Sequence, residues 1–234
     1  MKKRTFYTEF AYIFGLIGLA FGTALMEAAD FGVSMVVAPA YLVYRKLSQV
    51  WGFFSFGMAE YMLQAFLLII LMIVLKRFKV SYLFSFVTAV IYGFLLDGSM
   101  GIVALFSGEN FVLRIILYSL GFLSCTAGVS LIFHTYIAPE VYELFVKELS
   151  TKYNINIHKF KTGYDCVSCL VAILISFAFF GLWHFEGIKI GTIIGALING
   201  WTISRFTKFF EKHWEFKDGL RMRNYFLTST VEDI

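Results

Sequence analysis

The chain has 234 residues, of which 59% are hydrophobic and 15% are charged, and its net charge is +4. A soluble domain is usually about 45–50% apolar and about 25% charged, so this composition excludes a single soluble core and indicates that lipid covers much of the surface. The positive charge is then a signal of topology and not of nucleic-acid binding. We expect the protein to contact the lipid bilayer and to bind no nucleic acid.

Apolar runs predict an all-α membrane protein with six transmembrane helices, because a span needs about 20 mostly apolar residues. The runs cover about residues 10–29, 51–75, 80–106, 111–137, 163–184 and 188–209, with a tail at 210–234. The first run has no small-residue cleavage site after it, so we expect a retained span and not a signal peptide. A short turn is expected at residues 107–110.

Two segments between these runs are less apolar. Residues 31–50 are broken by Gly32 and Pro39, which favours a re-entrant or in-plane segment. Residues 138–161 are predicted to form an amphipathic helix with Pro139 near its first turn, where the missing N–H costs nothing. Its apolar face would hold Val141, Leu144, Phe145, Leu149 and Tyr153, and the other faces Glu143, Lys147 and Lys152.

Lysine and arginine predict the orientation, since cytoplasmic segments carry an excess of both. With both termini in the cytoplasm, 16 of the 20 basic residues lie inside. The inner set is Lys2, Lys3, Arg4, Lys76, Arg77, Lys79, Lys147, Lys152, Lys159, Lys161, Arg205, Lys208, Lys212, Lys217, Arg221 and Arg223. The outer set is Arg45, Lys46, Arg114 and Lys189.

The two prolines of the chain predict an internal duplication. Ala38-Pro39 and Ala138-Pro139 each open a short helix-like run that leads through a glycine to an acid and a long apolar span. The copies, about 10–106 and 111–209, also match at Leu47/Leu149, Ser48/Ser150, Gly57/Gly163 and, with a one-residue gap, Glu60/Asp165. Three spans in each copy would invert the second relative to the first, as in many secondary transporters.

Several stretches resemble the YczE/YyaS/YitT group of bacterial integral membrane proteins, most closely its YczE-like branch. They are Ala29-Asp30-Phe31-Gly32-Val33-Ser34, Phe56-Gly57, Leu96-Asp97-Gly98-Ser99-Met100, Gly121, Gly128-Val129, Asp165, Gly191-Thr192-Ile193-Ile194-Gly195-Ala196-Leu197 and Gly200. The group commonly has a proline after its Gly-Val-Ser, where this chain has Met35. We expect no cytosolic domain like that of YitT-type relatives, because about 25 residues follow the last predicted span. The resemblance implies a bacterial cytoplasmic membrane protein for which transport is the common presumption.

Acids in or near the spans are the candidate binding residues, because ionisable groups in lipid are costly and usually functional. Asp97 would bind a cation, an amine or a proton; the alternative is a structural carboxylate bonded to a neighbouring helix. Glu60 and Asp165 lie at the starts of the second and fifth spans. They are either gates or coupling sites for transport, or acids that are stabilised by the positive end of a helix dipole. Glu27 ends the first span, and Asp30 is expected to turn the chain toward Gly32.

Other polar or small residues near these acids could have either a functional or a structural role. Tyr92 precedes Asp97 by five residues and would offer an aromatic face to an ammonium. Gly191 and Thr192 begin a stripe of small residues that either packs closely or lines a path. Cys166 and Cys169 have C-x-x-C spacing, for which packing is the favoured interpretation. Pro39 and Pro139 are expected to have structural or gating roles.

No metal, cofactor or enzymatic activity is expected, since H-E-x-x-H, G-x-S-x-G and P-loop patterns are missing. The chain is read as one membrane domain, residues 1–234, acting as a proton- or ion-coupled secondary transporter, or a facilitator, of a small polar, cationic or zwitterionic solute. The alternatives are a substrate-binding subunit of a multi-component transporter and a non-transporting scaffold or regulator that docks partners through residues 138–161. A homodimer is left open.

Overall fold

The computed structural model describes residues 4–76, 78–105, 110–183 and 185–220, and within them the chain forms eight helices and two short strands. The helices are α1 (Thr8–Ala28), α2 (Ala38–Leu47), α3 (Phe56–Leu75), α4 (Val80–Val103), α5 (Phe111–Phe133), α6 (Val141–Lys152), α7 (Ile157–Phe180) and α8 (Ile190–His213). The strands are β1 (Arg4–Tyr7) and β2 (Trp214–Lys217), which pair in parallel and were not predicted from the sequence. Of the turn expected at 107–110, residues 107–109 lie outside the described residues, as do Lys2, Lys3, Arg77, His184, Arg221 and Arg223.

Side-chain caps explain where three of the long helices begin. The side chains of Ser55 and Asn110 accept hydrogen bonds from backbone N–H groups in the first turns of α3 and α5. Asn156 does the same for His158 and Lys159 at the start of α7. Such caps satisfy donors that have no partner inside the helix.

The Asn156 cap corrects the prediction that the fifth span begins near residue 163. It starts α7 at Ile157, so Lys161 lies within that helix and not at the end of the amphipathic helix predicted over 138–161. The predicted amphipathic helix over 138–161 is likewise shorter, since α6 covers only Val141–Lys152. Glu143, expected on its polar side, is 2% exposed. Lys161 is 1% exposed, so it was wrongly counted among the cytoplasmic surface charges.

Glycines bring α1 and α5 into direct backbone contact. A Cβ atom at Gly22 would lie 2.6 Å from the Gly121 carbonyl oxygen, and one at Gly128 would lie 2.6 Å from that of Gly15. Ser124 adds a hydrogen bond to the Gly18 carbonyl oxygen at 2.7 Å. Late residues of α1 thus meet early residues of α5, so the two helices run antiparallel, and this close packing agrees with the small-residue pattern of the first span.

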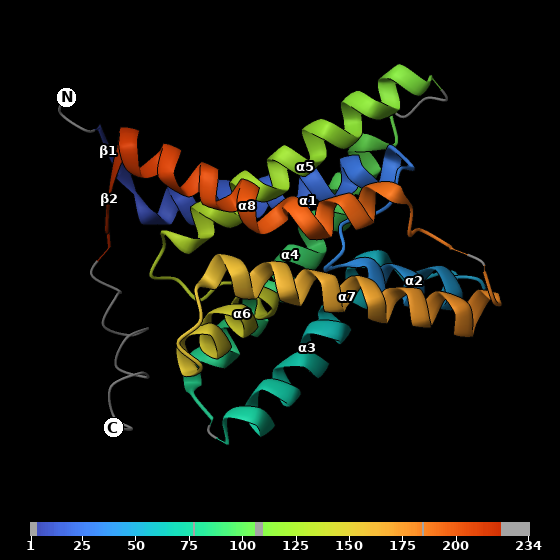
Figure 1. Cartoon of the computed structure of the whole chain (residues 1–234), viewed down its shortest axis with the longest axis horizontal. Helices are drawn as coiled ribbons and strands as arrows, with labels where there is room; N and C mark the ends of the chain where they lie inside the picture. The colour runs from blue at the N-terminus through green and yellow to red at the C-terminus, as the bar shows by residue number, and fades with distance from the viewer. Residues whose placement is uncertain (1–3, 77, 106–109, 184, 221–234) are drawn as a thin grey trace.

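The remaining helices pack around this pair (Figure 1). Helices α1, α5 and α8 lie side by side, and α2, α3, α6 and α7 form a second group below them, with α4 in contact with α1, α3 and α6. The pairing of β1 with β2 joins the first described residues to the end of α8. The core is therefore built from residues distant in the sequence.

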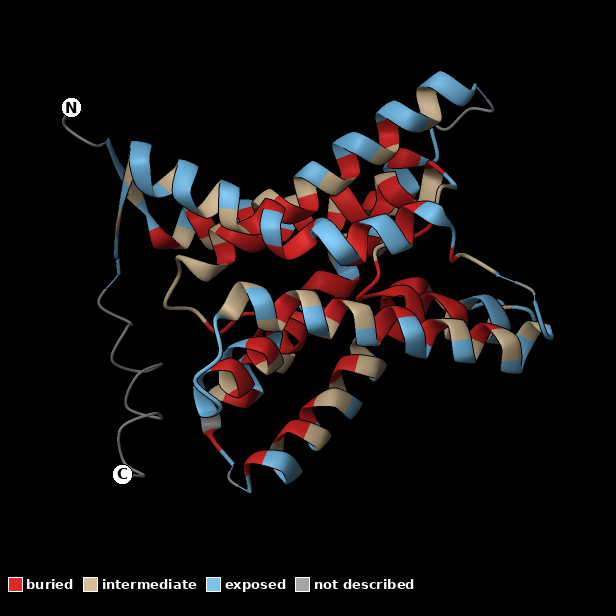
Figure 2. Ribbon diagram, viewed as in Figure 1, coloured by how far each residue is buried: buried red, intermediate tan, exposed pale blue. Residues whose placement is uncertain are grey.

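The surface is apolar over much of the long helices. Figure 2 shows buried residues gathered where helices face one another and exposed residues on their outer sides. Large hydrophobic side chains are exposed on these outer sides, among them Phe66 on α3, Phe94 on α4 and Leu170 on α7. Five helices, α1, α3, α4, α5 and α7, are long and apolar enough to cross a membrane. These features indicate a multi-pass membrane protein; α8 does not meet the same composition criterion.

Candidate functional site: a buried carboxyl cluster between two pockets

Four acids and one lysine are enclosed in the middle of the molecule. We call Glu60, Glu140, Glu143 and Asp165, together with Lys161, the carboxyl cluster, and each of its members is at most 2% exposed. They come from α3, the start of α6, and α7. A charge removed from water is costly unless it is paired and hydrogen-bonded, so the pairing of these groups decides their charge state.

Lys161 is the base on one side of the cluster. Its Nζ donates a hydrogen bond to Glu143 Oε1 at 2.8 Å and lies 3.3 Å from Asp165 Oδ1, one helical turn away. Asn199 of α8 donates to Asp165 Oδ2 at 2.6 Å. Glu143 Oε2 has no hydrogen-bond partner among the described residues. Two carboxylates thus share one ammonium.

Glu60 and Glu140 lie on the other side and have polar but uncharged partners. Tyr142 donates to Glu60 Oε2 at 3.0 Å, while Glu60 Oε1 has no partner within the described part of the chain. Gln64 donates to Glu140 Oε2 at 3.3 Å and accepts from the Val141 N–H at 2.9 Å. Burial, and then the Glu143 carboxylate, raise the pKa of Glu140 to about 8.

A narrow central cavity adjoins the cluster. Glu140, Glu143, Lys161 and Asn199 line it, together with Tyr92 and Thr23, whose hydroxyls are 3.1 Å apart. Its accessible volume is about 20 Å³, which suffices for about one water molecule. The expected residue Tyr92 is therefore in this site, and Glu60 and Asp165 bond to residues that line it.

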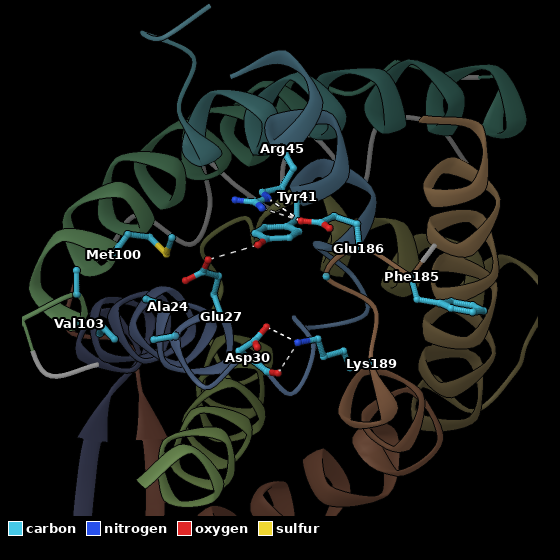
Figure 3. Close-up of a pocket in the computed structure, with 13 residues that line it drawn as sticks. Ala24, Glu27, Asp30, Tyr41, Arg45, Met100, Val103, Phe185, Glu186 and Lys189 are labelled. Atoms are coloured by element: carbon cyan, nitrogen blue, oxygen red, sulfur yellow. Dashed lines mark hydrogen bonds and ion pairs between the residues drawn. The ribbon is translucent and has the colours of Figure 1, made fainter. Parts of the chain in front are cut away.

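A larger pocket of about 400 Å³ lies at the C-terminal end of α1, and we call it the Glu27 pocket. Figure 3 shows its charged residues facing one another across the opening. Arg45 of α2 pairs with Glu186 at 2.8 Å, and Lys189 pairs with Asp30. Glu27 is half-buried and receives a 3.4 Å hydrogen bond from Tyr41.

The segment around Asp30 and Gly32 forms one wall of the Glu27 pocket through a strained turn. Asp30 and Gly32 have φ angles of 54° and 108°, in the left-handed region that favours glycine. Thr192 donates to the Val33 carbonyl oxygen at 2.8 Å, and the Gly191 N–H donates to that of Phe31 at 3.0 Å. In the structure these two residues of α8 hold this turn in place.

A third pocket, of about 220 Å³, lies at the C-terminal end of α5, and we call it the His158 pocket. It is lined by Pro139, Lys147, His158 and Glu211, among others. Because α1 and α5 are antiparallel, the Glu27 pocket and the His158 pocket lie at opposite ends of this helix pair. The central cavity contacts α1 and α5 between those ends.

Asp97 does not line any of these three spaces. Its Oδ2 accepts from the Ser55 hydroxyl at 2.6 Å, and its Oδ1 accepts from the Gly57 N–H at 2.8 Å. The carboxylate therefore sits at the N-terminus of α3, where the helix dipole favours a negative charge. Pro39 lies in the first turn of α2, and Pro139 precedes the Glu140 cap of α6.

Sequence reasoning missed Glu140, Lys161, Arg45 and Glu186 as members of these sites. Lys161 and Asp165 are four residues apart, a spacing that pairs opposite charges on one helix. This signal became readable only once the start of α7 was known. The three cysteines, Cys125, Cys166 and Cys169, are free, and the described residues contain no group of three His, Cys, Asp or Glu side chains able to hold a metal.

Comparison with known proteins gives a family but no activity. A family model described as a family of unknown function, DUF6198, matches residues 6–208. Neither the curated proteins nor the solved structures contain a match.

Proposed function

The chain belongs to the DUF6198 family, whose function is unknown, and we propose that it is a secondary transporter of a small cationic or zwitterionic solute. The observation that carries the proposal is the buried carboxyl cluster between two pockets at opposite ends of the α1–α5 pair. Alternating access needs a closed centre with separate approaches from the two sides. The Glu27 and His158 pockets would be these approaches.

An inverted repeat is the second part of the proposal. Each half has a long helix, a short helix and two long helices, α1 to α4 and then α5 to α8. Packing supports the equivalence, since α1 contacts α4 as α5 contacts α8, and α2 contacts α7 as α3 contacts α6. The glycine contacts show that α1 and its counterpart α5 are antiparallel. We infer that α8 is a sixth span and that α2 and α6 are short helices that do not cross.

The topology and the family resemblance extend the proposal. With both termini in the cytoplasm, the Glu27 pocket would face outward and the His158 pocket inward, in a bacterial cytoplasmic membrane. The resemblance to the YczE/YyaS/YitT group is compatible with this arrangement and stays a proposal, since the matching family is DUF6198.

The class of solute follows from the charges of the Glu27 pocket. Its bases are each paired with an acid, whereas among the described residues Glu27 has a hydrogen bond from the Tyr41 hydroxyl and no ion pair. A primary ammonium group of the solute would form an ion pair with the Glu27 carboxylate and contact the Tyr41 ring. A zwitterion would also place its carboxylate near Arg45 or Lys189. A volume of about 400 Å³ is within the usual range for small-ligand sites.

Uptake into proteoliposomes tests the proposal. We expect purified protein to move members of a panel of radiolabelled amines and amino acids, and Glu27→Gln to raise the half-saturation concentration about tenfold, the equivalent of about 1.4 kcal/mol of binding energy. Glu215→Gln is the matched control, because Glu215 is exposed on β2 and pairs with Lys217 at the surface. Folded protein that transports no member of the panel would refute the proposal.

A further inference from the structure

We propose that Glu60 and Glu140, held by Tyr142 and Gln64, bind one exchangeable proton whose release and uptake couple transport to the proton gradient. This inference rests on the proposed function for its coupling role, but proton binding at the site is measurable without transport. We call the four residues the proton site.

The first argument is the balance of charge. Glu60 and Glu140 are 0% and 2% exposed, and neither pairs with a lysine, arginine or histidine in the described residues. The nearest base, Lys161, is already shared between Glu143 and Asp165. Two ionised carboxylates side by side in a medium of low dielectric are strongly unfavourable, so one unit of positive charge is required between them.

The second argument is an unused acceptor. Glu60 Oε1 is fully buried and has no hydrogen-bond partner, whereas Oε2 accepts from Tyr142. A buried carboxylate oxygen without a donor is costly. A proton on Oε1 removes the negative charge of Glu60, and the cost of burying that charge is larger than the cost of burying a neutral carboxyl group.

The third argument is size. The adjoining cavity has an accessible volume of about 20 Å³, which is enough for one water molecule and not for an organic solute. Within the described residues no three acidic, histidine or cysteine side chains meet as a metal-binding set. A proton delivered through a single water therefore fits this site better than a solute or a coordinated metal.

The neighbouring titratable groups are compatible with a single exchanging proton. The groups facing the site from the elements packed around it are Tyr12 of α1, Tyr92 of α4, Cys125 of α5, Glu143 of α6, and Lys161, Tyr164 and Asp165 of α7. The tyrosines and the cysteine are neutral near pH 7, and Lys161 is committed to two acids. Glu60 and Glu140 are left as the pair whose charge changes.

The position of the proton site gives it a mechanical consequence. Glu60 and Gln64 are on α3, whereas Glu140 and Tyr142 are at the start of α6, so the site joins the two proposed repeats. With the proton bound, the contact between α3 and α6 carries one negative charge instead of two and is supported by the hydrogen bonds of Tyr142 and Gln64. After the proton leaves to water, both carboxylates are ionised, and their repulsion favours separation of α3 from α6.

Infrared difference spectroscopy during a pH titration of purified protein tests the inference. Wild-type protein should show the carbonyl stretch of a buried protonated carboxyl group, which is lost as the pH rises. Glu60→Gln and Glu140→Gln should each abolish this titrating band. Glu148→Gln should retain it, because Glu148 is partly exposed and bonds Lys79 and Tyr82 away from the site.

A second variant keeps the test valid if the glutamine variants fail to fold. Tyr142→Phe removes the hydroxyl that stabilises the ionised form of Glu60, so the band should then disappear at a higher pH than in wild type. A band that is absent from wild type, or that neither glutamine variant nor Tyr142→Phe alters, overturns the inference. Displacement of the band by sodium at constant pH, with choline as the control ion, would show a sodium site and also overturn it.

Failure of this inference can be told apart from failure of the proposed function. Solute uptake that proceeds equally with and without a pH gradient, together with no titrating band, would support the proposed transport function and refute the proton site. A titrating band in a protein that moves no solute would support the proton site and refute the proposed transport function.

Discussion

The Glu27 pocket and the carboxyl cluster are both built from acids and bases of distant segments, but they balance their charges differently. In the Glu27 pocket, Arg45 and Lys189 each have an acid within 3 Å, and water reaches the pairs. In the cluster, the one lysine pairs with two of the four acids, and all five groups are cut off from water. Similar pairs should therefore contribute very different free energies in the two places.

Burial is the reason for the difference. An exposed ion pair contributes about 0–1 kcal/mol, because water and salt screen it. A buried pair adds little net stability when intact, but removing one partner leaves a bare charge and costs about 3–5 kcal/mol. The cluster is thus the place where a single change of charge has structural consequences, as a coupling site requires.

The largest effect is expected at the only base of the cluster. Lys161→Met keeps a side chain of similar length but leaves Glu143 and Asp165 without an ammonium group. The free energy of unfolding should therefore fall by about 3–5 kcal/mol at neutral pH. Chemical unfolding in detergent micelles would measure it. The loss should shrink at low pH, because protonation removes the unpaired negative charges.

A combined variant sharpens this prediction. Lys161→Met with Glu143→Gln and Asp165→Asn removes the acids together with the base, and it should regain much of the lost stability. A single variant Lys161→Met as stable as wild type would show that the lysine does not balance the cluster.

A smaller effect is expected at Asp97, whose charge is balanced by N–H and O–H donors. Asp97→Ala removes the hydrogen bonds from Ser55 and Gly57 and should cost about 1–3 kcal/mol of stability. Asp97→Asn keeps the shape and should transport solute with a half-saturation concentration within about twofold of wild type. A large loss of transport in a folded Asp97→Asn protein would instead assign Asp97 to the solute path, as the sequence first suggested.

The smallest effect is expected in the Glu27 pocket. Lys189→Met breaks the pair with Asp30, which keeps a second partner in Arg114 at 2.8 Å. The change in the free energy of unfolding should be below about 1 kcal/mol and should vanish at high salt. A loss as large as that of Lys161→Met would contradict the contrast between the two regions.

Helix positions were largely predictable, and the composition of the site was not. Long apolar runs gave α1, α3, α4 and α5 nearly in place, because span length is set by the bilayer. Glu60 and Asp165 were identified from their repeated position, and both proved fully buried. Asp97 was also identified, yet the structure places it at the α3 cap, because proximity to a neighbouring helix is not encoded in the local pattern.

The sequence by itself determined the membrane class and the positions of the long helices, since these depend on local composition and spacing. Only the tertiary structure decided that Glu143 and Lys161 are inside, because their burial depends on where α6 ends and the Asn156 cap starts α7. It also decided that Glu60 and Glu140, 80 residues apart, are both buried and are bonded to uncharged partners, Tyr142 and Gln64. Charge balance in a buried site is a property of neighbours in space, and no one-dimensional pattern specifies it.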